Sequence, residues 1–133
     1  MPLPLGRSLL VLSCLAAPLG LAAPASAQSR LIESYTARLS SEDHFNSNGE
    51  RLTSPAAIIR QDRANFHKFG IRDAEDEGDR FFADMANRAL MERLLERGRT
   101  TGSARRAIVN GTPLIRVDVY DGPGGPYVEV SVD

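Results

Sequence analysis

The chain has 133 residues, of which 42% are hydrophobic and 25% are charged, values close to those of soluble globular domains. With 16 basic and 17 acidic side chains the formal net charge is −1, so no overall field attracts nucleic acid or an anionic membrane. These values exclude a fibrous or wholly disordered chain, and we expect no nucleic-acid partner.

Residues 1–27 have the pattern of a secretory signal peptide. Arg7 precedes an apolar run at 8–17, and Ala25-Ser26-Ala27 is a small-x-small cleavage site. The run is too short to span a membrane as a helix of ~20 residues, so we expect no transmembrane span. We expect cleavage after Ala27 and a secreted or periplasmic protein. The preference for arginine over lysine is typical of a GC-rich genome and, with the short signal, indicates a bacterial protein.

Cys14 is the single cysteine, and it lies within the predicted signal. The alternative reading is a lipoprotein lipobox at 11–14, but Leu12 is bulky for such a site and the apolar core is short. Cleavage after Ala27 would leave residues 28–133 as a cysteine-free mature domain. Disulfides, thiolate metal sites and a cysteine nucleophile would then be excluded.

The first half of the mature chain predicts a strand, a polar loop and a helix. Period-two alternation predicts the strand over residues 30–39. Residues 40–50 are mostly turn-formers. Ser54-Pro55 has the pattern of a helix start, and Gly70 that of its end. The side chains expected to face the core are Leu31, Tyr35, Ala37 and Leu39 from the strand, and Ile58, Ile59, Phe66 and Phe69 from the helix. Those expected on the outer side of the helix are Arg60, Arg63 and His67.

The second half predicts two more helices and a hairpin. A charged connector at 71–84 leads to a helix over 85–97, with Asp84 as its N-cap and Leu90, Met91, Leu94 and Leu95 as its apolar stripe. Ser103 is expected to cap a helix over 104–110. Residues 114–120 and 127–132 alternate on either side of a turn at 121–126, which predicts antiparallel strands. The element order is β-α-α-α-β-β, a single small α+β domain whose C-terminal hairpin packs on helices.

Asp62 is the most unusual polar residue, because the helical pattern places it in the middle of the apolar face. A carboxylate buried without partners costs several kcal/mol or changes its protonation state. We therefore expect a structural role, with hydrogen bonds from an arginine or, most simply, from N–H groups of the 40–50 loop. Asp62, Arg63 and Arg72 are the expected structural polar residues, and a catalytic Asp62 is the alternative.

Two histidines are candidates for chemistry. His44 and His67, with Asp43 or Asp73, could form a two-histidine, one-carboxylate metal site, although nothing fixes the distance between them. The candidate catalytic residues are therefore Asp43, His44, Asp62 and His67.

The connector partly matches an EF-hand calcium loop, with Gly78 at the sixth position. Glutamates at positions 3 and 5, Arg80 at position 8 and an aspartate at position 12 depart from that pattern. The candidate metal ligands are Asp73, Glu75, Glu77, Asp79 and Asp84. We expect instead a solvated acidic loop that is tied to Arg72 and Arg80 and anchored by Phe81 and Phe82, with no cofactor.

Two classes of function fit these residues. The favoured class is a small secreted or periplasmic, non-catalytic binding or interaction module, whose partner is an unidentified protein or envelope component. No nucleophile–base spacing emerges, and just over a hundred residues leave little room for a deep pocket. The alternative is a small metal-dependent or Asp/His-based hydrolase using the polar segment 42–80. Convergence of the four candidate catalytic residues would favour the hydrolase.

Overall fold

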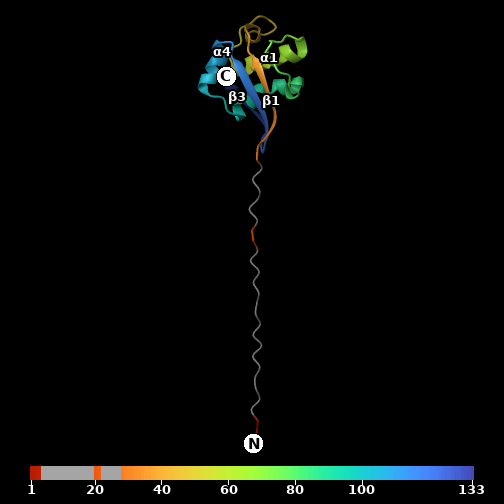
Figure 1. Ribbon diagram of the computed structural model, residues 1–133, viewed down its shortest axis with the longest axis vertical. Coiled ribbons are helices and arrows are strands. Elements are labelled where there is room, and N and C mark those ends of the chain that lie inside the picture. Colours follow the sequence, from red (N-terminus) through yellow and green to blue (C-terminus); the bar gives the residue numbers. More distant parts are fainter. Residues whose placement is uncertain (4–19, 22–27) are drawn as a thin grey trace.

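Three antiparallel strands form the sheet against which the helices pack (Figure 1). Strand β1 (Arg30–Arg38) pairs with β2 (Leu114–Gly122), which pairs with β3 (Gly125–Val132). The orange β1 thus lies beside the blue C-terminal strands, far away in sequence. The computed structural model describes residues 1–3, 20–21 and 28–133. The predicted signal peptide, its cleavage site and the lipobox fall largely outside these residues and stay predictions.

The predicted hairpin is confirmed, but its turn is tighter than expected. The strands extend to Gly122 and resume at Gly125, so only Pro123 and Gly124 connect them. Gly125 has a φ of 105°, a left-handed value that favours glycine. Neither Pro123 nor Gly124 has a positive φ, so the left-handed residue of this reversal is Gly125, directly after the two connecting residues. The glycines at the ends of the turn therefore let the ladder continue to its tip.

The segments between β1 and β2 are mostly short helices. They are the 3₁₀-helix η1 (Ser41–His44), α1 (Pro55–Ala64), the π-helical turn η2 (Asn65–Phe69), the 3₁₀-helix η3 (Phe81–Ala83), α2 (Met85–Ala89), α3 (Met91–Arg97) and α4 (Gly102–Asn110). None of the helices in these described segments is long and apolar enough to cross a membrane. With the three-stranded sheet, they make a single small α+β domain, as the sequence predicts.

Side-chain caps fix where α1, α2 and α4 begin. The Ser54 hydroxyl accepts a hydrogen bond from the Ala57 N–H at 3.2 Å, and the Asp84 carboxylate caps α2. Gly70 ends the turn after α1 with a φ of 68°. The expectation that Ser103 caps the last helix is wrong. The helix begins two residues earlier than expected, so the Thr101 hydroxyl stands in the capping position.

The predicted 85–97 helix is interrupted at Leu90. This residue ends α2 and serves as the N-cap of α3, with φ and ψ of −89° and 3°. The break changes the helix phase, so Leu90 is 37% exposed instead of continuing the apolar stripe. Phe69 is also misassigned, since it is half-exposed. It lies in the π-helical turn, which has a wider spacing than the regular helix used for the prediction.

The hydrophobic core lies between one face of the sheet and the helices. Alternate strand residues point into it, as period-two alternation requires. Leu31 is an exception and is about half-exposed, because the β1–β2 register shifts between Leu31 and Glu33. The buried sheet residues are Tyr35, Ala37, Ile115, Val117, Val119, Val128 and Val130, and the buried helical residues include Ile58, Ile59, Phe82, Met91, Leu94, Leu95 and Ile108.

Candidate functional site

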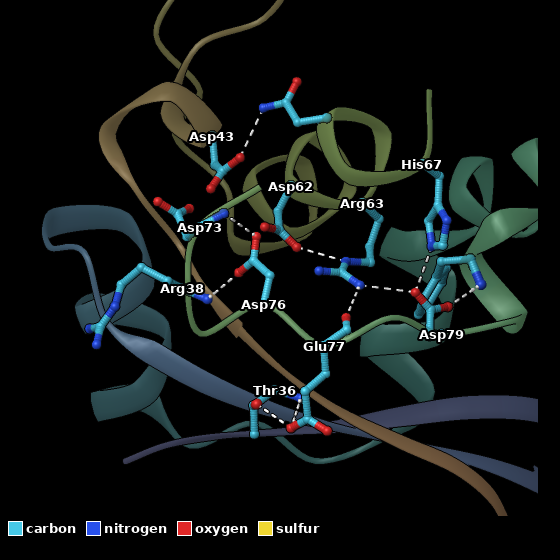
Figure 2. A network of polar contacts seen from close by, with 12 residues as sticks. Thr36, Arg38, Asp43, Asp62, Arg63, His67, Asp73, Asp76, Glu77 and Asp79 are labelled. Atoms are coloured by element: carbon cyan, nitrogen blue, oxygen red, sulfur yellow. Dashed lines mark hydrogen bonds and ion pairs between the residues drawn. The ribbon is translucent and has the colours of Figure 1, made fainter. Parts of the chain in front are cut away.

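A buried arginine lies at the centre of the polar network in Figure 2. Arg63 Nε donates to Asp62 Oδ2 at 2.7 Å, and its Nη1 donates to Asp79 Oδ1 and to the Glu77 carbonyl oxygen, each at 3.0 Å. The Arg63 side chain is fully buried, so its predicted outward position is wrong. The connector folds back over this side of α1 and supplies two of the three acceptors, which makes burial of the guanidinium possible.

Aromatic rings cover the same guanidinium. Arg63 Cζ lies 4.3 Å from the ring centre of Tyr35 and 4.6 Å from that of Phe66. Arginine suits this environment because its planar group can form hydrogen bonds at its edge while it stacks on aromatic faces. Arg63 therefore joins α1, the connector and β1.

Asp62 is buried, as the helical pattern predicts, and its donor is an arginine, one of the two expected kinds of partner. Its neighbour Arg63 donates to it, and the predicted donors in the 40–50 loop do not. Burial raises the pKa of Asp62 to about 8, while the Arg63 charge lowers it and the carboxylates of Asp43 and Asp76 raise it further. One guanidinium faces two carboxylates here. Retention of a proton by Asp62 relieves the excess negative charge.

His67 and Asp79 form the only contact in the network that resembles catalytic machinery. His67 Nε2 lies 2.7 Å from Asp79 Oδ1, and Asp79 Oδ2 accepts a hydrogen bond from the Phe82 N–H at 2.5 Å. A buried carboxylate orients a catalytic histidine in this way in hydrolases, but such a site also needs a nucleophile beside the ring. Within the part of the chain that the structure describes, Asp79 is the only hydrogen-bond partner of His67.

His44 lies in a different environment. Its Nδ1 is 2.8 Å from the Ser40 carbonyl oxygen, and its Nε2 is 2.8 Å from the Ile108 carbonyl oxygen. A neutral imidazole can donate to only one of these two acceptors at a time. Because both nitrogens face backbone carbonyls in a buried position, His44 connects η1 to α4 and presents neither nitrogen to a substrate.

Asp43 belongs to a capping box at the start of η1. It accepts hydrogen bonds from the Ser40 N–H and from the Asn65 side-chain amide, both at 2.9 Å. Burial raises its pKa, as does the nearby carboxylate of Asp73. Asp43 and Asp62 thus lie on one side of Arg63, and His67 lies on the other (Figure 2).

Within the described residues, the four candidate catalytic residues make no side-chain hydrogen bond with one another. Asp62 and His67 belong to one network, which joins them through Arg63 and Asp79. Asp43 and His44 make other contacts. Asp43 bonds to Asn65, His44 to Ile108, Asp62 to Arg63 and His67 to Asp79. Among residues 28–133, no group of three or more histidine, aspartate or glutamate side chains is placed to hold a metal ion.

The acidic connector covers the edge of β1. The Glu77 carboxylate accepts from the Thr36 N–H at 3.2 Å, and the Glu77 N–H donates to the Thr36 carbonyl oxygen at 2.9 Å. Asp76 accepts from the Arg38 N–H at 2.8 Å, and Glu75 pairs with the Arg38 guanidinium at 2.9 Å. Unpaired edge strands readily bind other strands. The connector forms hydrogen bonds with backbone groups along part of this edge, through its own carboxylates and backbone.

The residues tied to the connector differ from those predicted. Arg38 and Arg63 pair with it, whereas Arg72 lies over the Phe66 ring at 4.0 Å and Arg80 donates only its backbone N–H to Glu33. Anchoring by the phenylalanines is confirmed, since Phe82 is fully buried and Phe81 packs against the core. Thr36, Arg38 and Asp76 were not predicted to take part in these contacts. The strand pattern contains no signal for which backbone N–H groups remain unpaired.

A second feature, which the sequence analysis did not single out, is a groove on the outer side of α1. We use "the groove" for two adjoining hollows of about 380 and 440 Å³ that share Asn46, Ser47, Gln61 and Phe69. The first hollow extends to Arg60, Ala64, Lys68, Met85 and Arg88, and the second extends to Glu42, Phe45 and Ile71. A sequence signal does exist, since Arg60, Ala64 and Lys68 recur at intervals of four and so share a helical face.

No family model, curated protein or solved structure matches the chain.

Proposed function

We propose that the protein is a non-catalytic binding module that docks another protein in the groove. One observation carries this proposal. The side chains that could act as catalytic acids, bases or metal ligands are already paired with other groups of the protein. Both nitrogens of His44 face carbonyl oxygens, Asp62 pairs with Arg63, and His67 pairs with Asp79. Groups held in this way stabilise a fold, and they are not presented together to a substrate.

The groove supports the proposal because exposed apolar side chains gather along it. Phe69 and Ile71 are each about half-exposed, Met85 is 70% exposed and Phe45 is 40% exposed. Apolar groups clustered on a polar surface are typical of protein-binding sites, and an aromatic residue in a hollow is a typical anchor point. The remaining lining is polar, with Asn46, Gln61 and Arg60 able to form directed hydrogen bonds.

The predicted location of the protein limits the kinds of partner that it can meet. A signal peptide at residues 1–27 would deliver the domain to the periplasm or the outside of a bacterial cell. We therefore propose that the partner is a secreted protein or a component of the cell envelope.

The alternative is the small hydrolase. One specific observation favours it, the oriented pair of His67 and Asp79. A purified protein that hydrolyses a model ester or amide, and that loses this activity in His67→Ala, would establish the alternative and contradict the non-catalytic proposal.

Site-specific photo-cross-linking tests the docking site. A benzoylphenylalanine is placed at Gln61, in the centre of the groove, and in a control chain at Glu92, an exposed residue that does not line the groove. The expected result in the exporting bacterium is a discrete adduct from position 61 only. Adding Ala64→Phe, which fills the first hollow, should abolish it. Equal adducts from both positions, or none from either, would contradict the proposal.

A further inference from the structure

The two hollows of the groove differ in charge. The first is lined by three cationic side chains, Arg60, Lys68 and Arg88, and by no carboxylate. This is a local imbalance in a chain whose net charge is only −1. Arg60 and Lys68 are exposed, and within the described residues neither has an ion-pair partner. Their charges are therefore available to a ligand.

Arg88 is a pre-positioned cation in this hollow. It is only 7% exposed, and its Nη1 donates to the carbonyl oxygens of Phe82 and Ala83 at 2.8 and 3.1 Å. These two bonds hold the guanidinium in place, while its other nitrogens have no protein partner in the described part of the chain. A charge that is already oriented and partly desolvated loses little freedom when a ligand binds.

The second hollow is mainly apolar. Phe45, Phe69 and Ile71 line it, together with Glu42 as its one charged residue. Phe45 is held there by a backbone bridge to Arg51, whose guanidinium also lies over the ring at 5.7 Å. Because Phe69 lines both hollows, the groove changes from cationic to apolar around a shared aromatic ring.

We propose that the groove binds an acidic peptide segment of a partner protein, with an apolar anchor side chain next to its carboxylates. The carboxylates contact Arg60, Lys68 and Arg88, and the anchor enters the hollow beside Phe69. This inference rests on the proposed function and names the chemistry of its partner. A peptide fits better than an anionic membrane, because a flat surface would also place negative charge against Glu42.

Selection from a displayed library of random 12-residue peptides tests this chemistry. The exported protein is the bait, and the composition of the selected peptides is the readout. We expect enrichment of aspartate and glutamate next to an aromatic or aliphatic residue. The paired substitution Arg60→Glu/Lys68→Glu should weaken binding of these peptides by about tenfold or more, because like charges then face each other. Raising the salt concentration should weaken wild-type binding in the same direction.

A matched control changes the net charge by the same amount outside the groove. Arg93 and Arg106 are exposed, and neither lines the groove. Arg93→Glu/Arg106→Glu should therefore leave peptide binding within about twofold of wild type, since exposed charges that lie far apart are screened by salt. Equal losses in the two paired variants would overturn the inference.

The remaining outcomes separate this inference from the proposed function. One outcome is that Ala64→Phe abolishes binding of selected peptides that are not acidic, or whose binding is unchanged by Arg60→Glu/Lys68→Glu. In that case the docking proposal stands, and the proposal of an acidic partner is wrong. If no selected peptide responds to Ala64→Phe, both proposals are wrong. Binding to phosphatidylglycerol vesicles that is lost in Arg60→Glu/Lys68→Glu, without selection of acidic peptides, would identify a membrane ligand and overturn the inference.

Discussion

Replacing Arg63 by methionine tests the role of the buried network most directly. Asp79 would remain buried without its cationic partner and Asp62 would lose its hydrogen-bond donor, and breaking a buried pair in this way costs about 3–5 kcal/mol. The contacts with the Tyr35 and Phe66 rings would be weakened as well, at about 0.5–2 kcal/mol. We therefore expect Arg63→Met to lower the free energy of unfolding by about 4 kcal/mol at pH 7.

Urea denaturation followed by circular dichroism measures this loss. With a typical slope of about 1–3 kcal/mol per molar urea, the midpoint should fall by about 1–4 M. The matched control is Arg60→Met on the same helix. Arg60 is exposed, so its replacement should change the free energy of unfolding by no more than about 0.5 kcal/mol.

A loss below about 1 kcal/mol in Arg63→Met would refute this reasoning, because the buried Asp79 carboxylate would then not depend on the guanidinium. If Arg63→Met does not fold, Arg63→Lys provides a milder test, since it keeps the charge but loses the forked geometry. The double variant Asp79→Asn/Arg63→Met should be more stable than Arg63→Met alone, because it removes the stranded carboxylate. Equal stability of these two variants would also contradict the argument.

Four further predictions concern pH, packing, the sheet edge and metal ions. Because burial raises the pKa of Asp62 from 3.8 to about 8, the native state holds a proton that the unfolded chain releases in this pH range. The free energy of unfolding, measured by urea titration, should therefore fall from about pH 4 to pH 8, and Asp62→Asn should flatten this slope. Gly98→Ala should lower the melting temperature by about 10 °C or more, since its Cβ would lie 1.7 Å from the Val128 carbonyl oxygen, whereas Gly102→Ala should change it by only a few degrees. Glu77→Ala should increase self-association in sedimentation velocity, because it uncovers part of the β1 edge. Calcium and EDTA should leave the melting temperature unchanged, because four connector carboxylates already have protein partners, those of Glu75, Asp76, Glu77 and Asp79.

The regular elements were predictable because local rules determine them. Period-two alternation identified all three strands, and the capping patterns at Ser54, Gly70 and Asp84 located helix ends. Such signals involve residues only a few positions apart. They do not depend on how the rest of the chain folds.

Arg63 could not be placed from its own helix. A helical wheel assigns an arginine to solvent, and its burial depends on acceptors from Glu77 and Asp79, more than ten residues later. Phe69 was misassigned for another reason, because a π-helical turn replaces the regular spacing after Ala64. In both cases the missing information was tertiary: the course of the connector, and the local change in helix geometry.

The candidate site was predictable only in part. The burial of Asp62 followed from periodicity, and the phenylalanine anchors of the connector followed from hydrophobicity. The groove did not follow, because it requires the loop around Asn46 to lie beside the helix around Gln61, and no periodic pattern encodes that contact. Arg60 and Lys68 also match the pattern of an ordinary solvated helical face, because the sequence does not show which residues lie beside them.

The distribution of charge around α1 connects stability with recognition. The connector carboxylates bind Arg63 and the edge of β1, and among the residues that the structure describes Arg60 and Lys68 have no acidic partner on the groove side. The same helix thus presents a neutralised arginine inward and available cations outward. The two sides should be separable, because within the described residues Arg60 and Lys68 make no hydrogen bond or ion pair with Arg63 or with its carboxylate partners. Arg63→Met should lower stability without changing which peptides bind below its melting temperature, and Arg60→Glu/Lys68→Glu should change the peptides with little effect on stability.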